Sequence, residues 1–153
     1  MRLLAQTTDA NRLSHLHGQC FSEAWSADYI AALLAQPATI ALICDSGFVL
    51  VRVAGGESEV LSLGVTPAAR RRGIGSILLG EALNQARTHG ATVMFLDVGA
   101  GNSPAIALYK RFGFAQVGSR PGYYTKAGAA PEDALVFRVD IAPVPVGNAV
   151  QLG

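Results

Sequence analysis

Charge is scarce in this sequence. Only 15% of its 153 residues are charged, and 12 Lys and Arg against 11 Asp and Glu leave a net charge of +1. A typical domain has roughly 25% charged residues, and a chain with so little net charge is not expected to bind nucleic acid or a membrane surface directly. No apolar run approaches the roughly 20 residues that a membrane-spanning helix needs. The first residues lack the long apolar segment of a secretory signal, so a cytoplasmic protein is expected.

Cysteine is also rare, since Cys20 and Cys44 are the only two. Two thiols are too few for a disulfide scaffold, and their spacing is not that of metal ligands. We therefore expect buried free thiols in a reducing compartment, and no bound metal. Hydrophobic residues, in contrast, make up 50% of the chain. That content is enough to bury a core and excludes an intrinsically disordered chain.

The spacing of apolar residues predicts a mixture of helices and strands. Helices are expected over residues 9–19, 26–37, 73–89 and 103–112, and strands over residues 39–44, 48–54, 57–65, 92–98, 114–117 and 134–141. This order favours an α+β domain of three layers (α/β/α), with helices on both faces of a mixed sheet. Without a repeat or a linker, residues 1–142 are predicted to form one domain, and the uncharged residues 143–153 an extended tail.

The most informative segment runs from Thr66 to Ser76, where a strand ends, a basic loop follows and two glycines begin a helix. The first N–H groups of a helix are unpaired and carry partial positive charge. Gly73 and Gly75 let an anion approach these groups, and Arg70, Arg71 and Arg72 add charge. The segment is neither a P-loop nor a dinucleotide-binding fingerprint. It favours a pyrophosphate or another phosphate cluster as ligand, the alternative being a solvated arginine run beside a turn.

A second segment reads Asn102-x-x-Ala105-x-x-Leu108-Tyr109-x-x-x-Gly113-Phe114. Together with Arg70-x-x-Gly73-x-Gly75, it resembles the GNAT superfamily of acetyl-CoA-dependent N-acetyltransferases, which implies the acyl-CoA N-acyltransferase fold with a mixed, mostly antiparallel sheet. The segments FSEAWS (21–26), RPGYY (120–124) and EDA (132–134) resemble the ribosomal-protein-alanine N-acetyltransferase (RimI-type) group. The resemblance extends over residues from about 20 to 141.

This resemblance implies a donor site for acetyl-CoA built from the third strand, the basic loop and the start of the last helix. The expected cofactor-binding residues are Leu63, Gly64, Val65, Arg70, Arg71, Arg72, Gly73, Ile74, Gly75, Ser76 and Asn102. Gly64 is expected to leave the strand edge clear for the cofactor, with a β-bulge as the alternative. Arg70 and Arg72 could instead face solvent or the adenosine phosphate, and Asn102 could be a plain helix cap.

The resemblance also implies two catalytic residues. Asp97, directly or through a water, would accept the proton of the amine, and Tyr109 would protonate the leaving thiolate. The group usually has Glu at the position of Asp97 and often Arg at that of Gly99. The alternatives are that Asp97 pairs with an arginine and that Tyr109 is a packing residue. Glu59 and His15 are weaker candidates for the base, because most such residues are simply exposed.

Trp25, Arg120, Tyr123 and Tyr124 are expected to wall the substrate groove, the last three from a glycine-rich loop. Their alternative is ordinary packing. The predicted function is transfer of acetyl from acetyl-CoA to a protein N-terminal α-amine, with the N-terminal alanine of a ribosomal protein as the implied target. A small-molecule amine acetyltransferase and a non-catalytic acyl-CoA-binding module remain alternatives. A pure binder would need neither Asp97 nor Tyr109, which argues against the latter.

Overall fold

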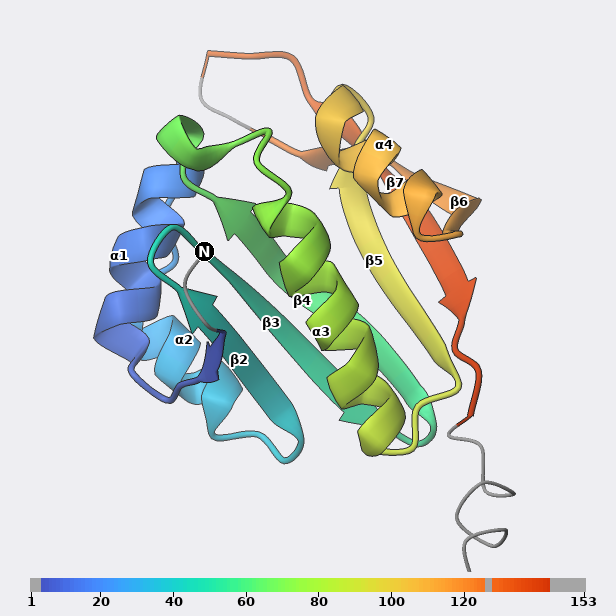
Figure 1. Ribbon diagram of the computed structural model, residues 1–153. Helices are drawn as coiled ribbons and strands as arrows, with labels where there is room; N and C mark the ends of the chain where they lie inside the picture. Colours follow the sequence, from blue (N-terminus) through green and yellow to red (C-terminus); the bar gives the residue numbers. More distant parts are fainter. Residues whose placement is uncertain (1–3, 126–127, 144–153) are drawn as a thin grey trace, which may run out of the picture.

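A seven-stranded sheet with the strand order β1-β2-β3-β4-β5-β7-β6 forms the middle layer (Figure 1). The computed structural model describes residues 4–125 and 128–143. The strands are β1 (Ala5–Gln6), β2 (Thr39–Cys44), β3 (Gly47–Ala54), β4 (Glu57–Val65), β5 (Val93–Gly99), β6 (Ala115–Tyr124) and β7 (Glu132–Asp140). The helices are α1 (Ala10–Cys20), α2 (Ala27–Leu34), α3 (Ile74–Thr88) and α4 (Ser103–Arg111), with a short 3₁₀ helix η1 (Pro67–Ala69).

The three-layer α+β architecture predicted from the sequence is confirmed, with three differences in the elements. β1 and η1 were not predicted, since two or three residues carry no periodic signal. β6 extends to Tyr124, so Arg120, Tyr123 and Tyr124 lie on a strand and not in the glycine-rich loop expected there. Most of the predicted tail, residues 144–153, lies outside the described residues, and the domain limits stay a prediction.

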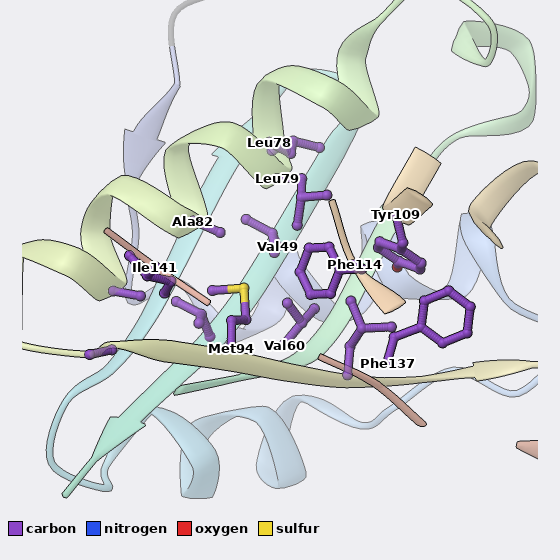
Figure 2. Close-up of a cluster of buried hydrophobic side chains, with 14 of the residues drawn as sticks. Val49, Val60, Leu78, Leu79, Ala82, Met94, Tyr109, Phe114, Phe137 and Ile141 are labelled. Atoms are coloured by element: carbon purple, nitrogen blue, oxygen red, sulfur yellow. The ribbon is translucent and has the colours of Figure 1, made fainter. Parts of the chain in front are cut away.

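Two hydrophobic clusters hold the layers together. β2 and β3 are buried on both faces, so alternate residues serve opposite clusters: Val49 and Val51 pack toward α3, whereas Phe48 and Leu50 pack toward α1 and α2. The larger cluster joins α3 and α4 to the sheet, and Figure 2 shows Tyr109 beside Phe114 and Phe137 within it. Both faces of the sheet are therefore covered where β2 and β3 run.

The sheet opens between β4 and β5, the only parallel pair among the described strands. These strands pair only through Glu57–Glu59 and Val93–Phe95, whereas β4 stays paired with β3 as far as Val65. Beyond Glu59 the two strands diverge toward the end where α3 begins and α4 lies (Figure 1). Within the described residues, residues 60–65 thus have a strand neighbour on one side only. No described helix has the length and apolar character needed to cross a bilayer.

Candidate active site

The connection from β4 to α3 presents a run of unpaired backbone donors. Left-handed backbone at Arg71 (φ 66°) and Gly73 (φ 80°) turns the chain into α3. The first hydrogen bond of α3 is donated by the Ile77 N–H to the Gly73 carbonyl. Among the described residues, the N–H groups of residues 71–76 therefore have no acceptor. Such donors at the positive end of a 15-residue helix suit an anion with several oxygens.

The two glycines of this loop serve different needs. Gly73 has a positive φ that strains other residues, and a Cβ there would meet nothing within 4 Å, so the space in front of α3 is open. A Cβ on Gly75 would lie 3.2 Å from Leu108 Cδ2. The missing side chain at Gly75 therefore lets the start of α3 pack closely against α4, which carries Tyr109.

The three arginines of the loop are not equivalent. Arg70 Nε donates to the Val65 carbonyl at 3.0 Å, and its terminal nitrogen donates to the Cys20 carbonyl at 3.4 Å. Arg70 thus joins the end of β4 to the end of α1, and we expect it to shape the loop more than to contact an anion. Arg71 and Arg72 are exposed beside the unpaired N–H groups and add positive charge there.

Leu63, Gly64 and Val65 form the end of β4, on the side that faces the opening. Because the Thr66 N–H donates to the Ser46 carbonyl, the alternation of the antiparallel ladder leaves the N–H groups of Leu63 and Val65 on the free edge, where an extended polar chain could pair with them as an added strand would. The reason for glycine at position 64 differs from the one expected. A Cβ there would lie 2.9 Å from Cys20 Cβ and 2.9 Å from Phe48 Cε1. Gly64 therefore makes room for α1 above the sheet face rather than for a ligand at the strand edge.

Asp97 lies on β5 and pairs with an arginine. Its Oδ2 is 3.4 Å from Arg120 Nε, and the Arg120 guanidinium lies 5.6 Å from the Tyr123 ring centre. The Asp97 side chain is 23% exposed, so solvent or a substrate can reach it. The ion pair that was the alternative hypothesis for Asp97 is therefore present. It places Asp97 close to Arg120 and Tyr123, two of the residues expected to wall the groove.

Tyr109 lies on α4 and is buried against the face of β5 opposite to the one that bears the Asp97 side chain. Its ring lies 5.7 Å from that of Phe114 and 6.4 Å from that of Phe137. Leu96 and Val98 belong to the same cluster, so Asp97, which lies between them on β5, faces the other way. Burial, and secondly the neighbouring Tyr124, raises the pKa of Tyr109 to about 12. Among the described residues, its hydroxyl has no hydrogen-bond partner.

Tyr124 links the two sides of this arrangement. Burial raises its pKa to about 12, with further contributions from Asp97, Tyr123 and Glu132, while Arg120 lowers it. A hollow of about 580 Å³ opens beside it at the C-terminal end of β5, and is lined partly by Gly101, Tyr124, Glu132 and Asp133. The hollow therefore leaves space for part of a ligand beside Tyr124.

Glu132 was not singled out from the sequence, although the EDA segment contains it. Its Oε2 accepts a hydrogen bond of 2.8 Å from the Gly101 N–H. A Cβ on Gly99 would lie 2.7 Å from Glu132 Oε1, and one on Gly101 would lie 2.9 Å from Oε2. Glu132 thus covers the turn between β5 and α4, and this packing requires both glycines. The next residue, Asp133, accepts from the Gly122 N–H at 2.8 Å and fixes β6.

Trp25 lies apart from these residues, on the connection between α1 and α2. Its backbone N–H donates to His17 Nδ1 at 3.1 Å, and its ring stacks on the His17 ring with 4.7 Å between the ring centres. Burial lowers the pKa of His17, a residue that no sequence motif indicated. This cluster accounts for Trp25 as a packing residue, and its predicted role in the groove stays a prediction.

The remaining candidates have local roles. Asn102 caps α4, since its Oδ1 accepts from the Ala105 N–H at 3.3 Å, and its predicted contact with a cofactor stays a prediction. Glu59 is paired with Arg52 at 3.1 Å, and His15 is exposed. Cys44 is buried and Cys20 half-buried, and both are free thiols. No cluster of three or more metal-ligating side chains occurs in the described part of the chain.

Comparison with known proteins gives consistent similarities. The profile of the Acetyltransferase (GNAT) family matches residues 10–114. The N-alpha-acetyltransferase RimI of Mycobacterium tuberculosis is 38% identical over 143 residues, which cover 86% of this chain and 87% of the relative. The [ribosomal protein bS18]-alanine N-acetyltransferase of Escherichia coli K12 is 26% identical over 90% of this chain and 95% of its own length. The crystal structure of the E. coli ribosomal-protein-S18-alanine N-acetyltransferase superposes with a TM-score of 0.83 at 25% identity, covering 95% of this chain and 97% of that one.

Proposed function

Because this chain belongs to the acetyltransferase (GNAT) family and is an acetyl-CoA-dependent N-acetyltransferase, we propose that it acetylates the α-amine of a protein N-terminus, with the N-terminal alanine of ribosomal protein bS18 as its first candidate substrate. The observation that carries this proposal is the opening between β4 and β5. Unpaired N–H groups flank it on the α3 side, and Asp97, Arg120 and Tyr124 flank it on the other. Two substrates could therefore meet there from opposite faces of the sheet.

The proposed donor site lies on the α3 side. Acetyl-CoA supplies an acetyl thioester, whose carbonyl carbon the amine attacks. The N–H groups of residues 71–76 would bind its pyrophosphate, and the free edge of β4 at residues 63–65 would hold the pantetheine arm. A backbone N–H of that edge would also polarise the acetyl carbonyl. Within the described residues the N–H groups of residues 71–76 have no competing protein acceptor, which supports the assignment.

Asp97 would act on the acceptor side. The amine nitrogen forms a bond to the acetyl carbon while the bond from that carbon to sulfur breaks, and the amine gives up one proton. Asp97 would accept this proton, directly or through a bridging water, since its side chain is one methylene shorter than the Glu usual in this group. An α-amine has a pKa of about 7.7–8.0, so a weak base is enough near neutral pH.

Tyr109 would return a proton to the departing thiolate. With a pKa of about 12, its hydroxyl stays protonated throughout the neutral range. A free thiol has a pKa of about 8.5, but the burial that raises the pKa of Tyr109 disfavours a thiolate in the same place too. The mismatch between acid and leaving group is therefore smaller than their ordinary pKa values indicate.

A thiol-release assay tests the proposal. Acetyl-CoA would be offered with a peptide copying the N-terminus of bS18, with the same peptide blocked at its α-amine but carrying one lysine, and with small polyamines. We expect turnover of the free N-terminal peptide at least 100-fold above that of the others. Preferred turnover of a small amine would instead identify a small-molecule acetyltransferase.

Matched variants then test the assignment of the base. Asp97→Asn should lower kcat for the peptide by about 100-fold, within the usual range for a general base. Asp140→Asn is the control, because Asp140 also pairs with an arginine, Arg138 at 3.1 Å, but lies near the far end of β7. Asp97→Glu should keep or raise activity, since it restores the reach typical of the group. Equal rates for Asp97→Asn and Asp140→Asn would reject Asp97 as the base.

A further inference from the structure

Arg120 reaches Asp97 across an intervening strand. In the sheet order β5-β7-β6, Asp97 is opposite Val136 of β7, and Arg120 is opposite Ala134. Two strand spacings separate β6 from β5, about 10 Å. The Arg120 side chain spans this distance over the small Ala134 and places Nε 3.4 Å from Asp97 Oδ2. The pair thus depends on three features of the sheet: the length of the Arg120 side chain, the small Ala134 beneath it, and the carboxylate of Asp97.

Without Arg120, the net charge of the side chains around Asp97 would be negative. Besides Arg120, β6 contributes Tyr123 and Tyr124, β7 contributes Glu132, and α4 contributes Tyr109 on the far side of β5. Asp97 and Glu132 both act on Tyr124 as negative charges, and Arg120 opposes them. Within the described residues, Arg120 is the cation that pairs with Asp97.

Protonation decides which amines can react here. An ammonium ion has no lone pair and cannot attack, yet a lone carboxylate would bind it well. At pH 7.5 about a third of an α-amine is neutral, against about 0.1% of a lysine side chain, given pKa values of about 7.8 and 10.4. A site that binds ammonium would therefore be occupied by unreactive lysines and polyamines.

We propose that Arg120 is a specificity-determining residue, which neutralises Asp97 so that the acceptor site takes the uncharged form of an amine and rejects ammonium ions. Lysine side chains and polyamines then neither occupy the site nor react at neutral pH, whereas an N-terminal α-amine does both. This inference rests on the proposed acceptor site. It goes further by giving Arg120 a role toward the charge of the substrate, beyond forming a wall of the groove.

The first test is the pH dependence of peptide acetylation by Arg120→Gln. The pH profile of kcat reports the pKa of the amine bound to the enzyme, whereas the profile of kcat/KM reports the pKa of the free amine. Removing the cation leaves Asp97 to stabilise the bound ammonium, so the midpoint of the kcat profile should rise by about one pH unit, as expected for a tenfold preference for the charged form. The midpoint of the kcat/KM profile should stay in place. A lower rate with an unmoved kcat midpoint would overturn the inference.

Two variants control this measurement. Arg120→Lys keeps the charge and should keep the wild-type midpoint. Arg138→Gln removes another strand arginine of similar exposure, 46% against 54% for Arg120, that pairs with Asp140 and not with Asp97. It should also leave the midpoint unchanged. A midpoint that moves equally in Arg120→Gln and Arg138→Gln would show a general charge effect and overturn the assignment.

The second test measures binding without turnover. Nα-acetyl-lysine amide, a cation at pH 7, would be titrated into the complex of the protein with CoA. We expect Arg120→Gln to bind it at least tenfold more tightly than wild type, with Arg120→Met as a second variant of similar length. Equal affinities would overturn the inference. If wild type failed to acetylate any peptide, the proposed function would fail, while this titration would still decide the role of Arg120.

Discussion

Replacing Tyr109 with Phe separates the chemistry of this residue from its packing. The ring packs against Phe114 and Phe137, and Phe keeps these contacts. Because the hydroxyl has no hydrogen-bond partner among the described residues, its loss leaves no group unpaired. We therefore expect the free energy of unfolding at pH 7 to change by less than about 1 kcal/mol. The rate constant kcat should nevertheless fall by about 100-fold or more, if the hydroxyl is the general acid.

The raised pKa of Tyr109 also predicts how stability changes in alkali. An unfolded tyrosine has a pKa of about 10, and the folded one has a pKa of about 12. Below pH 10 both states keep the proton, and stability is at its full value. Between pH 10 and 12 the tyrosine ionises first in the unfolded state. The free energy of unfolding therefore falls by up to about 2.7 kcal/mol, at about 1.36 kcal/mol for each unit of pKa difference. Tyr109→Phe should lack this contribution and keep only that of Tyr124, whose pKa is also raised to about 12, so its alkaline loss should be smaller than that of wild type.

Two measurements check both consequences. Thiol release at saturating acetyl-CoA gives kcat, and urea unfolding at intervals from pH 7 to 11.5 gives stability. Tyr29→Phe is the matched control, because Tyr29 is exposed on α2 and lies outside the proposed site. An unchanged kcat would remove Tyr109 from the mechanism. A large loss of stability at pH 7, or the same alkaline loss in the variant as in wild type, would refute the description of its environment.

Three further predictions follow from single contacts. Gly73→Glu puts a carboxylate among the unpaired N–H groups of α3 and should weaken CoA binding at least tenfold in calorimetry; unchanged affinity would mean that the pyrophosphate binds elsewhere. Gly99→Ala puts a Cβ 2.7 Å from Glu132 Oε1 and should lower the free energy of unfolding by about 1 kcal/mol. In a Glu132→Ala background the same substitution should be neutral or stabilising. Equal effects of Gly99→Ala in the two backgrounds, measured by urea unfolding, would contradict the contact. Burial lowers the pKa of His17, so stability is full above pH 6.5 and falls as the pH drops toward the folded pKa. The melting temperature should decline from pH 7 to 5 in wild type but less in His17→Gln, and parallel declines would exclude His17 as the cause.

The extent of β6 shows where reasoning from the sequence alone fails. The presence of Gly118, Pro121 and Gly122 predicts a loop in this segment, because glycine and proline usually end strands. The structure instead pairs residues 115–124 with β7, with irregularities in register near Gly118 and before Tyr124. An edge strand tolerates proline and bulges, since only one of its sides must pair. The prediction was wrong because pairing with a distant strand outweighed local propensity.

The two halves of the proposed site differ in the same way. The donor half is local, because the strand end, the arginines and the glycines that begin α3 follow one another in the sequence. Its spacing alone therefore favours an anion-binding loop, whereas acetyl-CoA as the ligand was implied by the resemblance to the GNAT superfamily. The acceptor half depends on the register of β5, β7 and β6. The contact of Glu132 with Gly101 joins residues 31 apart, and no spacing rule indicates it.

One departure of this chain from its group, Gly99, has a structural reason. A side chain at position 99, where the group often has arginine, would collide with Glu132, whose carboxylate already occupies that space. Glu132 in turn holds the turn before α4 through the Gly101 N–H. A positive charge is already present beside Asp97, on Arg120 of β6. An isolated Gly99→Arg substitution would therefore not restore the pattern of the group, because it would displace Glu132 and add a second cation beside a carboxylate that is already paired.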